Sequence, residues 1–266
     1  MNKPILSSQH RSPMTVLKDV TFGLLMRELK TRFGNYRMGY AWALLDPLFA
    51  ISVFCVIFGL KQRHGFGGVE APVFIAAGYL PYLMFRNTVT RLQSAVSSNR
   101  ALFCYRQVTP FSTLLTRFIL ECVIGILVAL VLICGLLWFG FNALPDDPIA
   151  VLIGYSLLML LSFSLGLIFC IATSISEEAK KIIPILMRPM LWISCVFFPL
   201  ASVPSNFQHW LLWNPVMHSL ELIRTGWIAG FNTQGGSWVY LSSTTLVLMT
   251  FAMSGYRLSH RKLIAI

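Results

Sequence analysis

Five charged side chains stand within or beside long apolar stretches of the sequence, where they could do chemistry. These are Asp46 in the first stretch, Arg117 and Glu121 four residues apart in a later one, and Glu221 and Arg224 three residues apart near the C-terminal end. Each such charge costs roughly 2.5–3.5 kcal/mol at the centre of a membrane helix, so it must be compensated or used. The chemistry that they offer is ion pairing, backbone capping or the gating of a polar pathway.

Two roles stand open for these groups. Asp46 directly precedes a proline, so it either caps the backbone groups that the proline frees or faces a pathway. Arg117 and Glu121 share one helix face and are predicted to pair with each other, which favours a structural bridge over a substrate role. For Glu221 and Arg224, a structural bridge and an exit gate are equally supported.

No motif of a soluble enzyme accompanies these charges. The sequence contains no G-x-x-x-x-G-K-[ST] run and no lysine that follows a glycine, so no loop of this chain can cradle nucleotide phosphates. It has no nucleophile elbow and no HExxH helix, and its five histidines and six cysteines lack metal-ligand spacing. We therefore predict a non-catalytic chain that binds no metal and no cofactor of its own.

The composition is that of a membrane protein. Hydrophobic residues make up 56% of the 266 residues and charged residues 12%, with a mean hydropathy of +0.70. A soluble domain carries about 25% charged residues, so about half of the usual water-facing charge is missing. No soluble fold of this size could bury so much apolar surface, whereas a bilayer can cover it.

Six stretches are long and apolar enough for a spanning helix, which needs about 20 residues. They cover residues 41–60, 72–89, 114–141, 149–175, 182–203 and 238–256. A further stretch, 207–231, is broken at Asn214-Pro215 and predicts a pair of short re-entrant helices. The expected fold is an all-α integral membrane protein with six transmembrane helices. Residues 1–40 form its cytoplasmic N-terminal segment and residues 41–266 its transmembrane domain, with the re-entrant segment at about 204–231.

The distribution of basic residues predicts the orientation. Six alternating spans place eighteen of the 21 lysines and arginines on one side of the membrane and three on the other. Cytoplasmic loops carry the excess of positive charge, so both termini are expected in the cytoplasm. The formal charge of +11 is thus a topology signal, and nucleic-acid binding is not needed to explain it.

Two cytoplasmic segments could meet a partner. Ser12-Pro13 is a typical helix start, and apolar residues then recur at helical spacing opposite a basic face, which predicts an amphipathic helix on the cytoplasmic leaflet. The apolar positions are Phe22, Leu25, Met26, Leu29 and Phe33, and the basic positions include Arg27, Lys30 and Arg32. The long connection between residues 86 and 117 is either a solvated loop or a docking element.

Two motifs of the sequence resemble those of a known family. The run from Arg32 to Leu48, RFGNYRMGYAWALLDPL, resembles the entry motif of ATP-binding-cassette permeases that export polysaccharides. In those permeases a basic amphipathic helix is followed by a glycine, a tryptophan and a Leu-x-Pro. Asn214-Pro215 with the acid and base that follow resembles their second signature. The chain resembles the permeases of Gram-negative capsular polysaccharide exporters most and O-antigen exporters next, although Asp46 stands where the family often has a neutral polar residue.

The resemblance implies an assembly in the bacterial inner membrane. Two copies of this chain would join two ATP-binding subunits, which hold ATP and Mg²⁺, and would pass a lipid-linked polysaccharide towards a periplasmic adaptor and an outer-membrane export protein. The residues expected to couple to the ATPase are Arg27, Lys30, Arg32, Arg100, Tyr105 and Arg106. The residues expected at the substrate pathway or its gate are Trp42, Asp46, Glu221 and Arg224.

Other functions stay open as alternatives. Within the same superfamily, the chain could export an O-antigen-type polysaccharide or a small molecule. An ion-coupled secondary transporter would need carboxylates deep within several spans, yet residues 149–175 contain none. A membrane scaffold without transport activity is excluded only weakly by the sequence.

Overall fold

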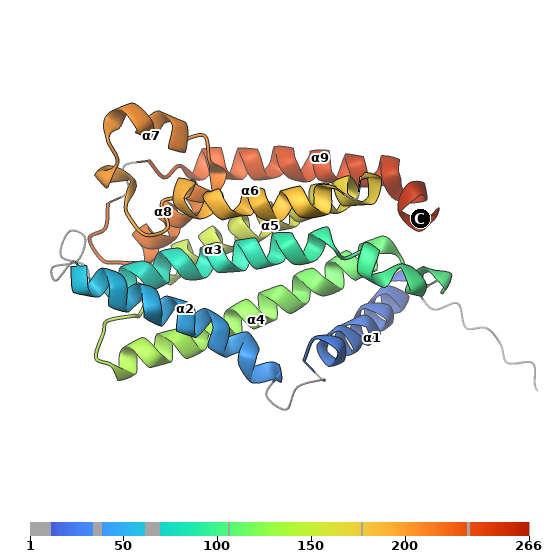
Figure 1. The fold of residues 1–266 in the computed structure, drawn as a ribbon, viewed down its shortest axis with the longest axis horizontal. Coiled ribbons are helices and arrows are strands. Elements are labelled where there is room, and N and C mark those ends of the chain that lie inside the picture. The colour runs from blue at the N-terminus through green and yellow to red at the C-terminus, as the bar shows by residue number, and fades with distance from the viewer. Residues whose placement is uncertain are drawn as a thin grey trace, which may run out of the picture.

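The computed structural model is a bundle of long helices with a shorter helix lying across one end (Figure 1). It describes residues 12–33, 39–61, 70–105, 107–176, 178–232 and 235–265, and within these ranges all regular structure is helical. The elements are α1 (Pro13–Phe33), α2 (Gly39–Lys61), α3 (Ala71–Gln93), η1 (Ser97–Cys104), α4 (Pro110–Trp138), α5 (Pro148–Ile175), α6 (Ala179–Ile193), η2 (Leu200–Ser202), α7 (Ser205–Leu211), α8 (Pro215–Trp227) and α9 (Trp238–Ala265).

The core of the bundle lies between α3 and α5. Helix α5 packs against α3 on one side and against α8 and α9 on the others, while α3 also contacts α2 and α4. Small residues allow these close approaches, since a Cβ at Gly166 of α5 would lie 2.7 Å from the side chain of Leu92. Phe74, Phe85, Leu158 and Leu161 are almost fully buried there.

The predicted helices agree with the structure in order and nearly in length, with one exception. Stretches 41–60, 72–89, 114–141, 149–175 and 238–256 correspond to α2, α3, α4, α5 and α9. Stretch 182–203 was expected to be one helix, but α6 ends at Ile193 and the chain then turns. That part of the prediction is wrong, because a buried arginine described below takes up the backbone carbonyls of the turn.

Among the described residues, α4 and α5 are long and apolar enough to cross a membrane on length and composition alone. Helix α4 has a mean hydropathy of 2.9 over its most apolar window and α5 has 2.3. The count of six transmembrane helices remains a prediction for the other helices.

The break predicted at Asn214-Pro215 separates two short helices, α7 and α8. The Asn214 side chain accepts a hydrogen bond of 3.0 Å from Val216 N, and Pro215 occupies the first helical position, where its missing N–H costs nothing. The two short helices of the prediction are confirmed, and their re-entrant placement in a membrane stays a prediction.

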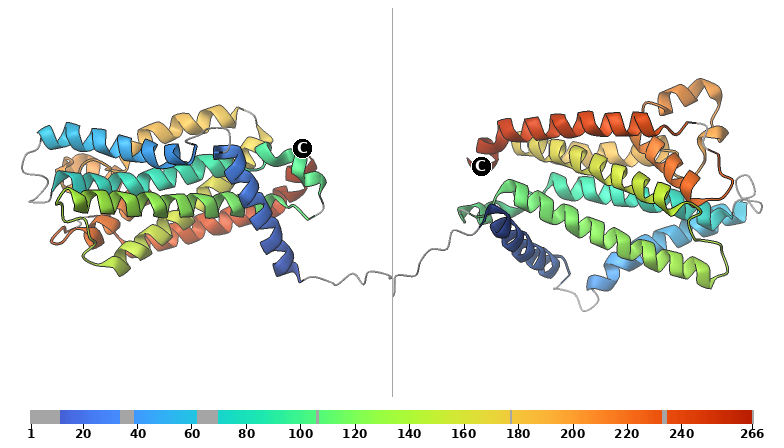
Figure 2. Two further views of the ribbon diagram at one scale, coloured as in Figure 1. Left: turned by 90° about the horizontal axis from the view of Figure 1, so that it is seen from below. Right: turned by 180° about the vertical axis from the view of Figure 1, so that it is seen from behind.

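Large apolar side chains cover much of the outer surface of the bundle. On α2, Trp42, Leu45, Phe49, Val53 and Val56 are exposed and recur at helical spacing. Similar rows lie on α4 and α6, and contiguous exposed apolar surface of this extent marks contact with lipid or with other proteins. Figure 2 shows α1 crossing the end of the bundle at a steep angle to the long helices.

Candidate coupling site

Helix α1 begins where the sequence predicted. Ser12 precedes Pro13, and its Oγ accepts a hydrogen bond of 3.3 Å from Thr15 N, which satisfies one of the free N–H groups of the first turn. The helix continues without interruption through Gly23 to Phe33 and packs chiefly against α4. Phe22 and Met26 of the predicted apolar face are exposed, as an interfacial helix requires of the side chains that enter lipid.

Two crossed ion pairs join α1 to α4. Arg32 Nη1 lies 2.5 Å from Glu121 Oε1, and Arg117 Nε lies 2.9 Å from Glu28 Oε1. Each helix thus carries one acid and one base four residues apart, and each charge meets its opposite on the other helix. The Arg117 Nε–H does not point at the carboxylate, so this second pair is electrostatic contact without hydrogen-bond geometry.

The pairing of Arg117 with Glu121 that the sequence suggested is therefore wrong. Their spacing does place them on one face of α4, but that face is covered by α1, which offers a separate partner to each. The side chain of Glu121 is 5% exposed and that of Arg117 is 10% exposed. At this burial both charges need close partners, because an unpaired buried charge costs several kcal/mol, roughly 3–5 when a pair is broken.

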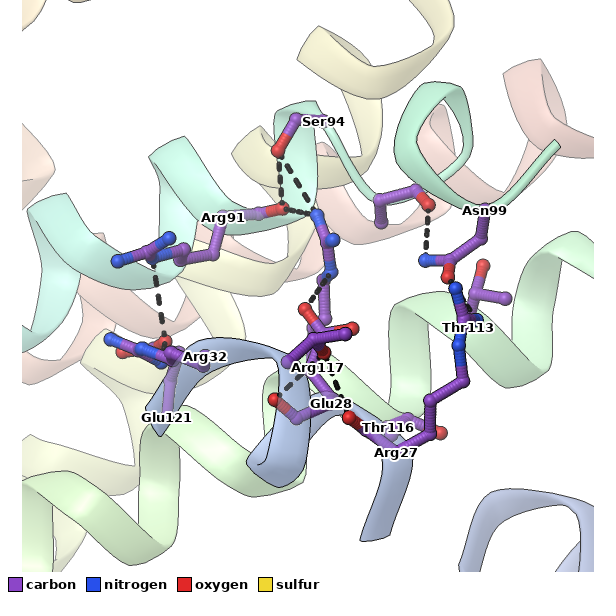
Figure 3. Close-up of polar contacts among 12 residues, drawn as sticks. Arg27, Glu28, Arg32, Arg91, Ser94, Asn99, Thr113, Thr116, Arg117 and Glu121 are labelled. Carbon is purple, nitrogen blue, oxygen red and sulfur yellow. Dashed lines mark hydrogen bonds and ion pairs between the residues drawn. The ribbon is translucent and has the colours of Figure 1, made fainter. Parts of the chain in front are cut away.

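Arg117 also holds the end of α3. Its Nη1 donates to the carbonyl oxygen of Arg91 at 2.9 Å and to Ser94 Oγ at 3.0 Å. The last carbonyls of a helix lack intrahelical partners and attract cations, so an arginine is well suited to this place. Arg91 itself lies 3.9 Å from Glu121, which brings five arginine and glutamate side chains of three helices into one cluster (Figure 3).

The same cluster reaches the connection between α3 and α4. Arg27 Nη1 donates to Asn99 Oδ1 at 3.0 Å, and Asn99 Nδ2 donates to the carbonyl oxygen of Ala95 at 2.9 Å. Asn99 belongs to η1 and is 5% exposed. Figure 3 shows the side chain of Arg27, the residue before Glu28 on α1, reaching Asn99. Helix α1 is therefore tied by side chains to η1 and α4, and through Glu121 and Arg117 of α4 to α3.

The residues predicted to couple to an ATPase fall into two groups. Arg27 and Arg32 lie inside the cluster and bind other parts of the same chain. Lys30, Arg100 and Tyr105 are exposed on α1 and η1, with Tyr105 66% exposed. Arg106 lies outside the described residues. The structure thus brings α1 and η1 together, and it leaves side chains of both open to contact.

The sequence reading missed Glu28, Arg91 and Asn99 as members of this cluster. A signal was present, since Glu28 and Arg32 are four residues apart with the charges in the opposite order to Arg117 and Glu121. Two complementary pairs at the same spacing are what two packed helices need for cross-pairing. The identity of the partner helix, however, depends on packing between residues far apart in the chain.

The predicted gate residues near the C-terminal end, Glu221 and Arg224, form a buried ion pair that also binds the backbone after α6. Arg224 is fully buried, and its guanidinium donates to the carbonyl oxygens of Cys195, at 2.8 Å, and of Val196. Glu221 Oε1 lies 3.6 Å from Arg224 Nη1 and accepts from Leu200 N at 3.3 Å. These bonds turn the chain after α6, since the carbonyls are used by Arg224 instead of by a continuing helix.

Helix α3 packs against the other side of the Arg224 guanidinium. The Arg224 guanidinium lies 4.1 Å from the centre of the Phe74 ring, a cation–π contact. Gly78, one turn further along α3, leaves room for the guanidinium, because a Cβ there would meet Arg224 and lie 2.5 Å from the carbonyl oxygen of Val196. The bridge between Glu221 and Arg224 is thus formed, and their role as a gate stays a prediction.

The other two predicted pathway residues lie on α2. Trp42 is 62% exposed at the start of the helix. Asp46 falls within α2, but its side chain lies outside the part of the chain that the structure describes. Among the described residues no group of three histidine, cysteine or carboxylate side chains could hold a metal ion.

Fold and site together are typical of a membrane subunit of a transporter: an all-helical bundle with long apolar helices, with α1 paired to α4 by largely buried charges, and a sequence without a nucleotide-binding loop. The chain belongs to the ABC-2 type transporter family, whose sequence profile matches residues 20–228. That range runs from within α1, through the ion-pair cluster, to the end of α8.

Named relatives match nearly the whole chain. It is 35% identical over 247 residues to the polysialic acid transport protein KpsM of Escherichia coli, covering 93% of this chain and 96% of that protein. It is 26% identical to the capsule polysaccharide export inner-membrane protein CtrC of Neisseria meningitidis, over 91% of each chain. It is 28% identical to the capsule polysaccharide export inner-membrane protein BexB of Haemophilus influenzae, covering 86% of this chain and 88% of BexB.

Proposed function

We propose that this chain is the membrane-embedded subunit of an ATP-driven exporter that moves a lipid-linked, capsular polysaccharide across the bacterial inner membrane. The observation that carries the proposal is the 35% identity to KpsM over almost the full length of both chains. CtrC and BexB, whose names also specify capsule polysaccharide export, match over similar shares of the chain. Agreement among three such relatives favours a capsular over an O-antigen-type or small-molecule substrate.

The chemistry of ATP hydrolysis belongs to a separate subunit in this proposal. The sequence offers no loop for phosphates, so ATP and Mg²⁺ would be bound by the partner, and this chain would supply the path and the response to the partner's motion. Two copies of this chain would assemble with two ATP-binding subunits. A periplasmic adaptor and an outer-membrane export protein would receive the polysaccharide.

Helices α2, α3, α4, α5 and α9 are five of the six proposed transmembrane segments. The sixth is α6, which has 15 residues, together with the turn that follows it. The ion-pair cluster and the C-terminal end of α9 lie towards one end of the bundle, and α7 with α8 lie towards the other (Figure 1). The positive-inside rule makes the cluster end cytoplasmic. Helices α7 and α8 would then enter the membrane from the periplasmic side.

The cluster supports a specific route for coupling. The exposed side chains of Lys30, Arg100 and Tyr105 would contact the ATPase, while Arg27 and Arg32 pass a displacement of α1 to η1 and α4. Coupling of this kind is a difference in contact energy between two states of the transporter. Glu121 lies near both Arg32 and Arg91, so this ion pair can exchange partners between states without leaving the buried carboxylate unpaired.

The proposal is tested by genetic replacement. A strain lacking its capsule permease, and supplied with this chain together with an ATP-binding subunit of a capsule exporter, is expected to place polysaccharide on its surface. Affinity purification of the chain should recover that subunit, with ATPase activity lost when the subunit's phosphate-binding lysine is replaced. Transport driven by a proton or sodium gradient without any ATP-binding subunit would refute the proposal in favour of a secondary transporter.

A further inference from the structure

Helices α4 and α5 follow one another in the chain but scarcely touch. Helix α4 packs instead on α3 and α1, and α5 packs on α3, α8 and α9. Between them lies a groove of 590 Å³, which is within the range of about 300–1,000 Å³ typical of ligand sites. The two most apolar helices of the described chain therefore flank an open space and not a packed interface.

The lining of this groove is almost wholly apolar. On α4 it runs from Phe118 through Ile126 to Ile133, and on α5 it includes Leu152, Tyr155 and Met159. Fifteen residues of α4 correspond to roughly 22 Å along the helix axis at 1.5 Å per residue. This length exceeds one leaflet of hydrocarbon, which is half of the roughly 30 Å core of a bilayer. The groove is thus long and narrow, with its axis along the helices.

One polar atom in the wall has no partner. The hydroxyl of Tyr155 is buried and makes no hydrogen bond within the protein. Because this hydroxyl has almost no accessible surface, it does not face the groove. The surface that a ligand would touch at Tyr155 is therefore apolar, which favours a hydrocarbon chain.

The groove continues into a second pocket of different character. Pro145 and Trp227 line both spaces, and the second one, of 370 Å³, is also lined by Glu70, Asn142 and Asp146. It lies at the end of the bundle opposite the arginine cluster, where the α4–α5 connection meets the start of α3. Its two carboxylates favour a cationic group and oppose a purely anionic one.

We infer that this composite site binds a bilayer lipid that carries a primary ammonium in its headgroup, with one acyl chain in the α4–α5 groove. The acyl chain fits an apolar slot of this length, and the ammonium can reach the pocket of Glu70 and Asp146. Within a membrane, an apolar groove is filled by lipid hydrocarbon and not by water. The inference rests on the membrane location alone and is independent of what the transporter exports.

The test uses the full chain in nanodiscs that contain equal amounts of phosphatidylethanolamine and phosphatidylglycerol. After transfer to detergent, native mass spectrometry counts the lipid retained by each variant. The wild-type chain is expected to retain one phosphatidylethanolamine, favoured over phosphatidylglycerol by about two- to fivefold, the size of an exposed ion pair. Ala129→Trp, which fills the groove, should lose it.

The matched control is Val131→Trp, on the same helix but outside the groove, which should retain the lipid. Glu70→Gln should remove the preference between the two lipids while leaving the acyl chain bound. Equal retention by Ala129→Trp and Val131→Trp would overturn the groove assignment, and a preference for phosphatidylglycerol would overturn the headgroup assignment.

A wild-type measurement guards against variants that fail to fold. Phosphatidylethanolamine with a photoactivatable group in its acyl chain should label peptides from residues 118–133 and 148–160 more than peptides from α9. Uniform labelling of all apolar helices would refute a specific site. Retention of a lipid-linked glycan in place of phosphatidylethanolamine would also refute it, because the groove would then belong to the export pathway.

Discussion

Replacing Arg32 by methionine tests whether Arg32 and Glu121 compensate each other's charge where α1 packs on α4. Arg32→Met removes the guanidinium that lies 2.5 Å from Glu121 Oε1. The carboxylate that remains is 5% exposed, with the half-exposed Arg91, 3.9 Å away, as its remaining ion-pair partner. The variant therefore leaves a buried charge with weak compensation, and it should destabilise the chain more than removal of both charges would.

The expected magnitude follows from burial. Breaking a fully buried pair costs roughly 3–5 kcal/mol, and an exposed pair is worth roughly 0–1 kcal/mol. Arg32 is 18% exposed and Arg91 offers partial compensation, so we expect Arg32→Met to cost about 2–3 kcal/mol. Adding Glu121→Gln removes the stranded charge, and the double variant should lie within about 1 kcal/mol of the wild type, a recovery of about 1–2 kcal/mol relative to Arg32→Met.

The assay is thermal unfolding of the full chain, purified in detergent with its ATP-binding subunit. At about 2–4 °C per kcal/mol for a chain of this size, Arg32→Met should lower Tm by about 4–12 °C, and the double variant should recover most of that loss. Arg257→Met, at an exposed position of α9, is the control and should leave Tm unchanged. If the double variant unfolds as early as the single one, the two charges do not compensate each other and the reasoning fails.

Three further predictions follow from other parts of the structure. Gly78→Ala should destabilise the chain by about 2–4 kcal/mol, because the added Cβ meets Arg224 and the carbonyl of Val196. Gly135→Ala, whose Cβ would meet nothing within 4 Å, should stabilise the chain by up to about 1 kcal/mol. Equal Tm values for the two variants would contradict the tight packing around Arg224. The double variant Arg100→Ala with Tyr105→Ala should insert into the membrane normally but abolish export and weaken recovery of the ATP-binding subunit. The control Arg257→Ala should change neither export nor recovery of the subunit. Normal export by the double variant, with the subunit still attached, would show that η1 is not the docking element. Reporter fusions after Ser174 and at the C-terminus should report cytoplasm and a fusion at Asp146 the periplasm; a periplasmic C-terminus would rule out six spans.

The sequence predicted the helices well because their signals are local. Hydrophobic length predicted α5 to within one residue at its start, and Ser12-Pro13 and Asn214-Pro215 marked two helix starts through capping chemistry that needs no tertiary information. The end of α6 could not be predicted in this way. It depends on the Arg224 guanidinium, which takes carbonyls from residues 26–29 positions earlier in the chain.

The partners within the ion-pair cluster also could not be predicted from local sequence. The spacing of Arg117 and Glu121 correctly placed them on one face of α4, but it could not reveal that α1 covers that face. Glu121 meets a partner 89 residues away in the chain, and such a pairing is decided by packing rather than by helical periodicity. Arg27 and Arg32 were predicted as coupling residues; the structure adds the intramolecular partners through which they could act.

Helix α3 connects the two arginine sites described above. Near its C-terminal end, the carbonyl of Arg91 and the hydroxyl of Ser94, just past the last turn, bind Arg117, while Phe74 and Gly78 near its start contact Arg224. Its 23 residues span roughly 34 Å, about the thickness of the hydrocarbon core. A displacement of α1 that reorients Arg117 would therefore act on one end of α3, whose other end contacts α8 and the turn after α6. In the proposed exporter, the motion of a cytoplasmic subunit would then reach the far side of the membrane through a single helix, without a chain of small rearrangements across the bundle.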